Sequence, residues 1–416
     1  MAKWNQSPLG TVADLCLGKM LDQDKNRGEP LPYLANVNVR WGEFTLDNLR
    51  TMRFEPHERD RYGLKFGDIV MCEGGEPGRC AIWKEQIPGM MIQKALHRIR
   101  PHDVLDYRFL YYNLLHIGTA KKFDQYFTGA TIKHLPGEKL AKVEVDIPPL
   151  PIQRRIAGIL SAYDELMENS QRRIRLLETM PRALYREWFV HFRFPGHEKY
   201  PRVPSALGDI PQGWKATTLG AHLAAIESGK RPKGGIREVA EGVPSIGAEN
   251  INGIGRHEFA SEKLIPREFF EQMRKGVVRN LDVALYKDGA YIGKSSYFRD
   301  GFPHSECCVN EHVFLLRANG VRLKQNALYI WLQEPDTVQT IRSKNANAAQ
   351  PGINQQTVGG LELILPDEKT AAHFDRLVEP LLAEIINLAK RIQNLRRTRD
   401  LLLPRLLSGQ LEIGKN

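Results

Sequence analysis

Two long stretches of the chain carry an apolar or neutral residue at every third or fourth position, the spacing of one face of an amphipathic helix. The first runs from Pro151 to about His191, and the second lies 218 residues further on. Because both seams keep the same register, we expect two long helices that pair with each other; the alternative is an amphipathic helix packed on its own domain. Pro181 and Pro404 are expected to kink or end the helices locally. The positions expected to pair are Leu160, Met167, Ile174, Leu177 and Leu184 in the first helix and Leu381, Ile385, Leu388, Ile392, Leu395 and Leu402 in the second.

The sequence outside these seams also repeats, which indicates a duplicated unit. Residues 66–71 are echoed by residues 280–285, and residues 143–148 by residues 361–366. Short strand-like runs separated by Gly and Pro turns predict a mixed α/β fold for each block. The expected organisation is an α/β block at 1–150, a helical region at 151–195, a linker at 196–211, a second α/β block at 212–366 and a second helical region at 367–416.

Composition agrees with a folded chain of more than one domain. Its 416 residues are 42% hydrophobic and 26% charged, which is ordinary for globular proteins. No apolar run approaches the roughly 18 residues of a membrane span, and the first residues lack the apolar run of a signal peptide. We therefore expect a cytoplasmic protein that has no membrane partner.

The chain has a net charge of +10, and the two helical regions, 151–195 and 371–416, each carry +3. An excess of Lys and Arg favours a polyanionic partner, because these side chains displace counterions from phosphates. Residues 1–150 and 196–370 carry only +2 each. Charge alone therefore does not locate a nucleic-acid site.

The five cysteines are scattered and odd in number, so we expect reduced thiols. The segment from His304 to His312 also contains Cys307 and Cys308, four potential metal ligands in all. It lacks the CxxC spacing of structural zinc sites, and adjacent residues of a strand face opposite sides of a sheet. We interpret the cysteines as packed thiols and expect no metal site here.

No common nucleotide-binding or hydrolytic motif occurs in the sequence: GxxxxGK[ST], GxSxG, HExxH and a helix-opening GxGxxG are all missing. The segment from Ile147 to Leu150 superficially resembles the Asn-Pro-Pro-aromatic motif of DNA adenine methyltransferases. However, it lacks both the Asn and the aromatic residue that would hold a flipped base. We interpret it as a strand stopped by two prolines before a helix, and we expect no catalytic residue in this chain.

Several polar, glycine-containing loops have the composition of nucleic-acid contacts, at residues 73–79, 128–135, 229–235, 287–294 and 345–356. Glycine allows the backbone to approach an anion, and short amide, hydroxyl and basic side chains read base edges or hold phosphates. The alternatives are plain turns and solvated loops. The expected contacts are Arg40, Arg79, Thr131, Lys133 and His134 in the first block, and Lys230, Arg231, Lys233, Lys294, Gln350 and Asn354 in the second.

Over essentially all of its length the chain resembles the DNA specificity subunits of type I restriction-modification enzymes. The resemblance rests on two blocks alternating with two helical regions, and on residues 67–76, 129–135 and 147–156. It implies two α/β target recognition domains, separated by two long helices that pair as an antiparallel coiled coil. The second block departs from the first at Ala349-Gln350-Pro351-Gly352, where the first has Ala130-Thr131-Ile132-Lys133.

The resemblance also implies a non-catalytic function. Each domain would bind one half of a split, asymmetric target in double-stranded DNA. The helices would dock methyltransferase subunits and, through them, the restriction motor subunit. S-adenosylmethionine, ATP and magnesium would then belong to those partners and not to this chain.

The length of the helices fits a spacer. About 38 helical residues at 1.5 Å each span on the order of 57 Å, more than the roughly 34 Å of one DNA turn. Two other functions remain open at this point. One is a self-contained DNA methyltransferase, which the missing motifs oppose, and the other is a coiled-coil scaffold without a DNA role.

Overall fold

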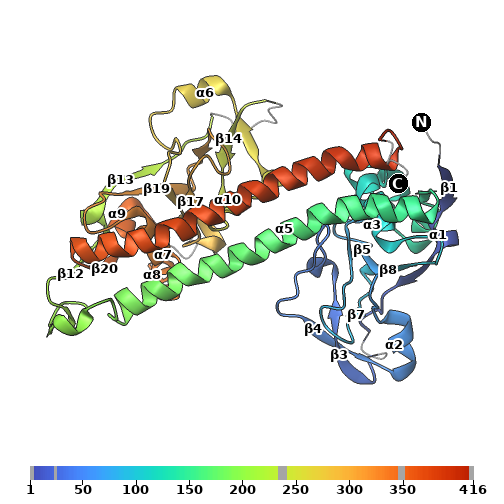
Figure 1. Ribbon diagram of the computed structural model, residues 1–416, viewed down its shortest axis with the longest axis horizontal. Helices are drawn as coiled ribbons and strands as arrows, with labels where there is room; N and C mark the ends of the chain where they lie inside the picture. Colours follow the sequence, from blue (N-terminus) through green and yellow to red (C-terminus); the bar gives the residue numbers. More distant parts are fainter. Residues whose placement is uncertain (1–3, 23–25, 233–240, 345–351, 412–416) are drawn as a thin grey trace. The chain divides into compact units, whose positions relative to one another are not determined.

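The computed structural model describes residues 4–22, 26–232, 241–344 and 352–411 (Figure 1). The chain forms two compact units, which we call unit 1 (Met1–Leu166 with Leu395–Asn416) and unit 2 (Met167–Asn394). Helices α5 (Leu150–Tyr185) and α10 (Glu368–Leu407) each contribute residues to both units.

Unit 1 is built on a four-stranded antiparallel sheet with the strand order β2-β8-β5-β6. A second sheet has the order β4-β3-β7, in which β3 pairs antiparallel with β4 and parallel with β7. The first strand, β1, pairs with the last, β9. The bounds are β1 Asn5–Pro8, β2 Ala13–Leu17, β3 Glu29–Leu34, β4 Arg50–Phe54, β5 Ile69–Cys72, β6 Cys80–Ile82, β7 Met91–Ile92, β8 Leu96–Pro101, β9 Glu144–Ile147, α1 Leu9–Val12, α2 Pro56–Tyr62, α3 Tyr107–Thr119 and α4 Gly137–Leu140.

Unit 2 repeats this topology strand for strand. Its four-stranded sheet has the order β13-β19-β16-β17, and its three-stranded sheet, β15-β14-β18, again combines one antiparallel and one parallel pairing. Strands β12 and β20 pair as β1 and β9 do, and a short hairpin β10-β11 has been added. The bounds are β10 Arg202–Val203, β11 Ile210–Pro211, β12 Lys215–Thr218, β13 Leu223–Ser228, β14 Val243–Ile246, β15 Lys263–Ile265, β16 Asp282–Tyr286, β17 Ser295–Phe298, β18 Cys308–Val309, β19 Val313–Ala318, β20 Glu362–Leu365, α6 Arg267–Glu271, α7 Gln325–Leu332, α8 Pro335–Ser343 and α9 Gln355–Gly359.

The matching strand orders confirm the sequence repeat, and the same ion pair is buried in both units. Asp68, at 1% side-chain exposure, binds Arg100 through two hydrogen bonds of 2.7 Å. Asp282, also at 1%, binds Arg317 through hydrogen bonds of 2.6 and 2.7 Å. Hydrogen bonding to the carboxylate raises the pKa of each arginine. A buried charge needs such a partner, so each sheet is held in one arrangement.

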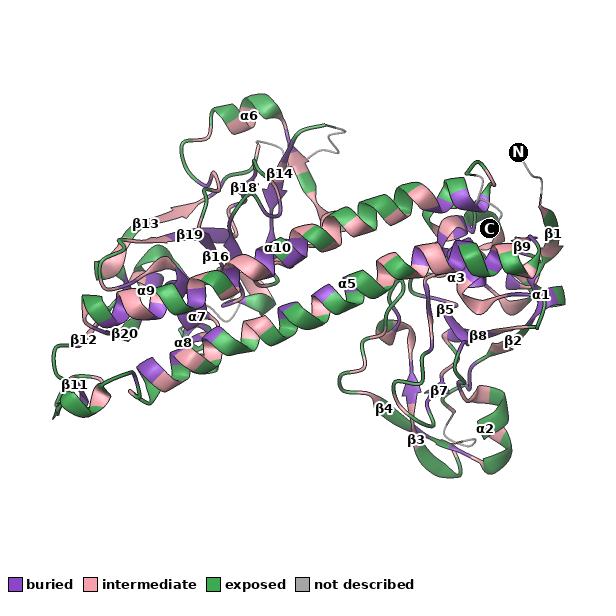
Figure 2. Cartoon of the chain, in the orientation of Figure 1, coloured by how far each residue is buried: buried purple, intermediate pink, exposed green. Residues whose placement is uncertain are grey.

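Both main sheets bury their central strands (Figure 2). Every residue of β5 is buried, and in unit 2 only the last residue of β16 is not. Helix α3 covers the sheet of unit 1 and begins at Asp106, whose carboxylate caps it by accepting hydrogen bonds from two backbone amides. Helix α7 occupies the same place in unit 2. Among the described helices, none joins the length to the apolar composition that crossing a membrane requires.

Within each unit α5 and α10 lie side by side (Figure 1). In unit 2 Arg173 pairs with Glu384 at 2.7 Å, and further along α5 the ring of Tyr185 packs on Phe374. The partner's number falls as the α5 number rises, so the helices are antiparallel. In unit 1 the guanidinium of Arg399 lies 2.5 Å from the Asp164 carboxylate. The predicted fold class, mixed α/β with two paired long helices, is confirmed.

Pro181 and Pro404 were predicted to kink or end the helices locally; neither ends its helix, and the kink stays a prediction. Helix α5 continues through Pro181 to Tyr185 and then into a π-helical turn, Arg186–Val190, while α10 continues through Pro404 to Leu407. A proline removes one backbone hydrogen bond, but packing on both sides of the position can hold the helix together. Pro181 is itself buried, and the aromatic residues that follow it enter the core of unit 2.

The predicted seam residues lie on the buried side of both helices, with a small shift in α10. Leu381 is only half-buried, and its neighbour Leu382 enters the core instead. The globular part of unit 2 packs on α10 in addition to α5, which widens the buried face beyond a heptad stripe. Of the other predicted positions, Leu160, Met167, Ile174, Ile385 and Leu388 are buried, and Leu177, Leu184, Ile392, Leu395 and Leu402 are half-buried.

Candidate nucleic-acid interface

Three loops of unit 1 come together at one surface, and we call them loop cluster 1 (residues 36–40, 73–79 and 128–134). The Asn36 side chain donates to the Gly74 carbonyl at 3.4 Å, and the backbone of Gly74 bridges to that of His134. The amide of Leu135 donates to the Glu73 carbonyl at 2.8 Å. All five predicted contacts of the first block, Arg40, Arg79, Thr131, Lys133 and His134, therefore belong to one structural feature.

Glycine makes this close approach possible at two positions. A Cβ on Gly74 would lie 3.1 Å from the His134 ring. Gly129 has a φ of +90°, and a Cβ there would lie 2.2 Å from the carbonyl oxygen of Ile132. Only glycine adopts this backbone without strain. The turn is closed by paired backbone hydrogen bonds of 2.8 and 2.9 Å between Thr128 and His134.

The tip of this turn presents donors to solvent. Thr131 is exposed, and the side chain of Lys133 is 57% exposed. The Lys133 ammonium lies over the ring of Phe127, 5.6 Å from its centroid, and 3.9 Å from an Asp124 carboxylate oxygen. These contacts restrict the lysine while leaving its charge accessible.

Arg79 lies in the cluster but is used internally. Its side chain is 12% exposed, donates to Glu76 at 2.6 Å and reaches the Asn36 carbonyl at 3.0 Å. Arg79 therefore ties two loops together, and the prediction that it contacts DNA directly stays without structural support. His134 is held by Glu73, with 3.2 Å between Nδ1 and the carboxylate, but keeps 45% of its side chain exposed. Arg40 is exposed and donates to the carbonyls of Val37 and Val39.

Two exposed apolar side chains in loop cluster 1 were missed by the sequence reasoning. Val37 is 63% and Ile132 is 66% exposed. Large apolar side chains are unusual on solvated loop tips, and such residues can contact thymine methyl groups. The signal in the sequence that could have identified them is an isolated aliphatic residue among polar loop positions.

Loops at the equivalent surface of unit 2 form loop cluster 2 (residues 228–231, 287–288, 311–312 and 352–354). The backbones of Asp288 and Gly352 form a bridge, as Gly74 and His134 do in unit 1. Side chains then link the loops: His312 Nδ1 lies 2.8 Å from Asp288, its Nε2 lies 3.3 Å from Glu311, and Arg231 lies 2.9 Å from Glu311. The architecture is shared, but the chemistry at the surface is different.

The other predicted contacts of unit 2 have different environments. Lys230 is exposed at the edge of loop cluster 2, whereas Arg231 is engaged by Glu311. The side-chain oxygen of Asn354 caps α9, accepting from Thr357 N at 2.8 Å, which leaves its amide NH2 as the group for an external contact. Lys233 and Gln350 lie outside the described residues.

Lys294 lines a basic cavity of unit 2. The cavity has a volume of about 300 Å³, and its lining includes Arg182, Arg256, Arg342 and Glu178. The Lys294 ammonium stacks on the Tyr291 ring at 4.3 Å. Burial raises the pKa of Glu178, although the adjoining Arg256 guanidinium opposes that rise. A site with this charge favours anions.

The arginines of the long helices divide into paired and exposed groups. The side chain of Arg399 is 13% exposed because it binds Asp164, which also accepts a 2.6 Å hydrogen bond from Tyr112. Arg173 pairs with Glu384. Arg172, Arg175, Arg396 and Arg397 are among the exposed arginines of these helices.

The cysteines are free thiols, as predicted. Cys307 and Cys308 are buried, and burial raises the pKa of both, that of Cys308 to about 11. Of the four potential ligands weighed in this segment, where no metal site was expected, His304 alone lies in a group of described residues that could hold a metal, with His257 and Glu262 as its partners.

Comparisons with known proteins agree with this architecture. Residues 1–179 match the family model described as the type I restriction modification DNA specificity domain. The specificity subunit of the type I restriction enzyme MjaIX from Methanocaldococcus jannaschii is 25% identical over 368 residues, 83% of this chain and 78% of the relative. The HindI specificity subunit of Haemophilus influenzae is 18% identical over 485 residues, 99% of this chain and 100% of the relative.

A solved structure shares the fold. The crystal structure of a type I restriction-modification system S subunit from M. genitalium aligns with a TM-score of 0.55, covering 97% of this chain and 96% of that one, at 18% sequence identity. At this identity the likeness concerns the fold alone.

Proposed function

This chain is a specificity subunit of a type I restriction-modification system, and from that premise we propose that it reads double-stranded DNA through two unlike surfaces. Loop cluster 1 reads one half of an asymmetric target, and loop cluster 2 reads the other. The observation that carries the proposal is the duplicated fold, in which equivalent loops present different side chains. Two copies of one scaffold with two different surfaces fit a target that is not palindromic.

Loop cluster 1 supplies one set of contacts. Lys133 and Arg40 are exposed cations suited to phosphates or guanine edges. Thr131 and His134 offer short donors, and Ile132 offers an apolar contact for a thymine methyl group. Arg79 acts by positioning the loops.

Loop cluster 2 supplies a different set. Lys230 is its exposed cation, and the Asn354 amide can donate to a base or a phosphate. His312 sits between two carboxylates, which orient its ring. The carboxylates of Asp288 and Glu311 repel phosphates but accept hydrogen bonds from cytosine amino groups.

The helices are proposed to dock the methyltransferase subunits and, through them, the restriction motor subunit. Helix α5 exposes Leu176 and Met180, 61% and 52% exposed, next to the exposed Arg172 and Arg175. Apolar side chains bordered by arginines are typical of protein interfaces. Replacing Arg172 and Arg175 by Glu should weaken co-purification with methyltransferase subunits, whereas Arg193→Glu, outside this face, should not.

We propose that this chain performs no chemistry and that S-adenosylmethionine, ATP and magnesium are bound by its partners. The missing nucleotide-binding motifs support this view. Incubating the purified chain with DNA and labelled S-adenosylmethionine tests it directly. Methyl transfer by the chain alone would establish the methyltransferase alternative.

Block exchange is the decisive test of two-site reading. Residues 1–145 are replaced by the matching block of a related specificity subunit, and the target of the reconstituted complex is determined. One half of the recognised sequence should change. A change in both halves, or in neither, would contradict the proposal. A salt-dependent gel shift with and without methyltransferase subunits separates DNA reading from a purely scaffolding role.

A further inference from the structure

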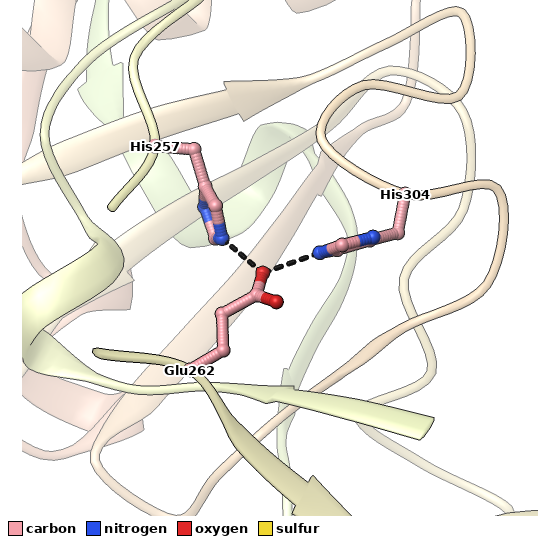
Figure 3. A group of neighbouring side chains, drawn as sticks. All are labelled: His257, Glu262 and His304. Carbon is pink, nitrogen blue, oxygen red and sulfur yellow. Dashed lines mark hydrogen bonds and ion pairs between the residues drawn. The ribbon is translucent and has the colours of Figure 1, made fainter. Parts of the chain in front are cut away.

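Two histidines and one glutamate of unit 2 converge on a single point (Figure 3). The Nε2 atoms of His257 and His304 both contact Oε1 of Glu262. The three donor atoms lie within 4.8 Å of one another. The imidazole planes are at 90°, so the two rings reach the carboxylate from different directions.

The three residues come from separate segments that the three-stranded sheet brings together. His257 lies before the turn Phe259–Ser261, Glu262 directly precedes β15, and His304 lies in the loop before β18. Strand β14 pairs with β15 on one side and with β18 on the other. The pairing of β14 with both neighbours therefore brings His304 to His257 and Glu262, which are five residues apart in the sequence.

The group is shielded from water. The side chain of His257 is 1% exposed and that of Glu262 is 15% exposed. The ring of Phe259 packs edge-on against both imidazoles, with centroid distances of 4.6 and 5.7 Å.

We propose that His257, Glu262 and His304 form a zinc-binding site. Two imidazole nitrogens and one carboxylate oxygen are a ligand set that Zn²⁺ accepts, whereas Mg²⁺ and Ca²⁺ prefer oxygen ligands throughout. Tetrahedral bonds of about 2.0–2.2 Å place ligand atoms about 3.3 Å apart, which small rotations of these side chains provide. The fourth position is left for water.

The equivalent position in unit 1 supports this assignment, because apolar side chains fill it. Counting back from β15 and β18 in unit 2, and in the same way from β4 and β7 in unit 1, aligns His257, Glu262 and His304 with Phe44, Leu49 and Ile87. All three of these apolar residues pack against one buried cluster of unit 1. In unit 2 the zinc ion therefore holds together the segments that hydrophobic contacts hold together in unit 1.

Zinc binding by the full-length chain tests the proposal. The protein is stripped with a chelator, dialysed against Zn²⁺ and analysed for bound metal by mass spectrometry, with Co²⁺ absorption reporting the ligand geometry. Wild type should retain about one zinc per chain with tetrahedral Co²⁺ bands. Glu262→Gln and His304→Asn should lower the affinity at least about 100-fold. His102→Gln, a carboxylate-paired histidine of unit 1, is the matched control and should bind like wild type.

A second variant separates metal loss from misfolding. The triple replacement His257→Phe, Glu262→Leu and His304→Ile copies the apolar corner of unit 1. It should keep the wild-type circular dichroism spectrum and bind no zinc at this site. Absence of zinc from wild type, or full retention by Glu262→Gln and the folded triple variant, would overturn the proposal.

Discussion

Units 1 and 2 have the same strand order and the same buried Asp–Arg pair. They differ in the side chains of their exposed loops and in the residues that stand at the position of His257, Glu262 and His304. Loop cluster 1 joins His134 to a single carboxylate, whereas loop cluster 2 sets His312 between two. Under these loops, His97 of β8 occupies the position that Phe314 holds in β19. The comparison teaches that the scaffold is fixed by a few buried interactions, while the surface is free to vary.

The largest expected effect concerns the shared ion pair. Asp68→Asn leaves Arg100 without its carboxylate partner, and breaking a buried pair costs about 3–5 kcal/mol. Asp282→Asn should cost about 1–2 kcal/mol less, because Arg317 keeps its 2.5 Å pair with Glu227. Hydrogen exchange in β5 and β16 reports the two units separately. Equal losses of stability in the two variants, or negligible losses in both, would contradict this expected difference between the units.

The helix pairing gives the next largest effect. Arg399→Ala removes a covered guanidinium and should destabilise unit 1 by about 2–3 kcal/mol, because Asp164 then lies half-buried with only Tyr112 as partner. Arg173→Ala breaks a pair in which the arginine is 49% exposed and should cost less than about 1 kcal/mol. Urea unfolding of both variants measures the difference. A larger loss for Arg173→Ala would reverse the expected order.

His97 of unit 1 should contribute a pH dependence that its counterpart in unit 2, Phe314, cannot. Burial lowers the pKa of His97, against the opposing hydrogen bond to the Leu135 carbonyl and the charge of Glu73. The unfolded chain therefore binds the proton more readily, so stability falls as the pH drops below about 6.5 and levels off below the folded pKa.

This contribution amounts to at most about 1.4 kcal/mol per pH unit for one proton. His97→Phe, which copies Phe314 of unit 2, should remove that part of the slope whatever it does to stability at pH 8. Urea unfolding between pH 5 and pH 8 provides the slopes. An unchanged slope in the variant would show that His97 is not the group responsible.

The smallest expected effect is chemical. Iodoacetamide should modify Cys16, which is partly exposed, and leave the other four thiols intact, because they are buried. Burial also raises the pKa of Cys72 and Cys80 in unit 1, which keeps them as unreactive thiols. Mass spectrometry of peptides identifies the modified residue. Modification of Cys307 before Cys16 would mean that unit 2 opens more readily than unit 1.

The long helices and the duplication could be predicted because both leave periodic signals in the sequence. Two local details of the helix prediction did not hold. The heptad spacing takes no account of packing by the globular part of unit 2, so the burial of Leu382 was not predicted. The tendency of Pro181 to end the helix was overestimated. The burial of Arg399 leaves no signal in the sequence, because its partner, Asp164, is 235 residues away.

The candidate sites were predictable only in part. The loops were singled out by their Gly and polar composition, and the backbone bridges at Gly74 and Asp288 bring them together in the structure. Which of their side chains remain accessible depends on pairs such as Arg79 with Glu76, and sequence does not reveal these pairs. The group at His304 was sought among its neighbours in sequence, whereas its partners are placed by the pairing of β14.

The central claim is that two copies of one scaffold read different parts of one DNA target. The most direct measurement is selection from a random DNA pool by the reconstituted complex, comparing wild type with Thr131→Ala/Lys133→Ala and with Lys230→Ala/Asn354→Ala. Each double variant should relax the selected bases in its own half of the site and leave the other half unchanged. If both variants relax the same positions, or neither relaxes any, the two surfaces do not read separate halves.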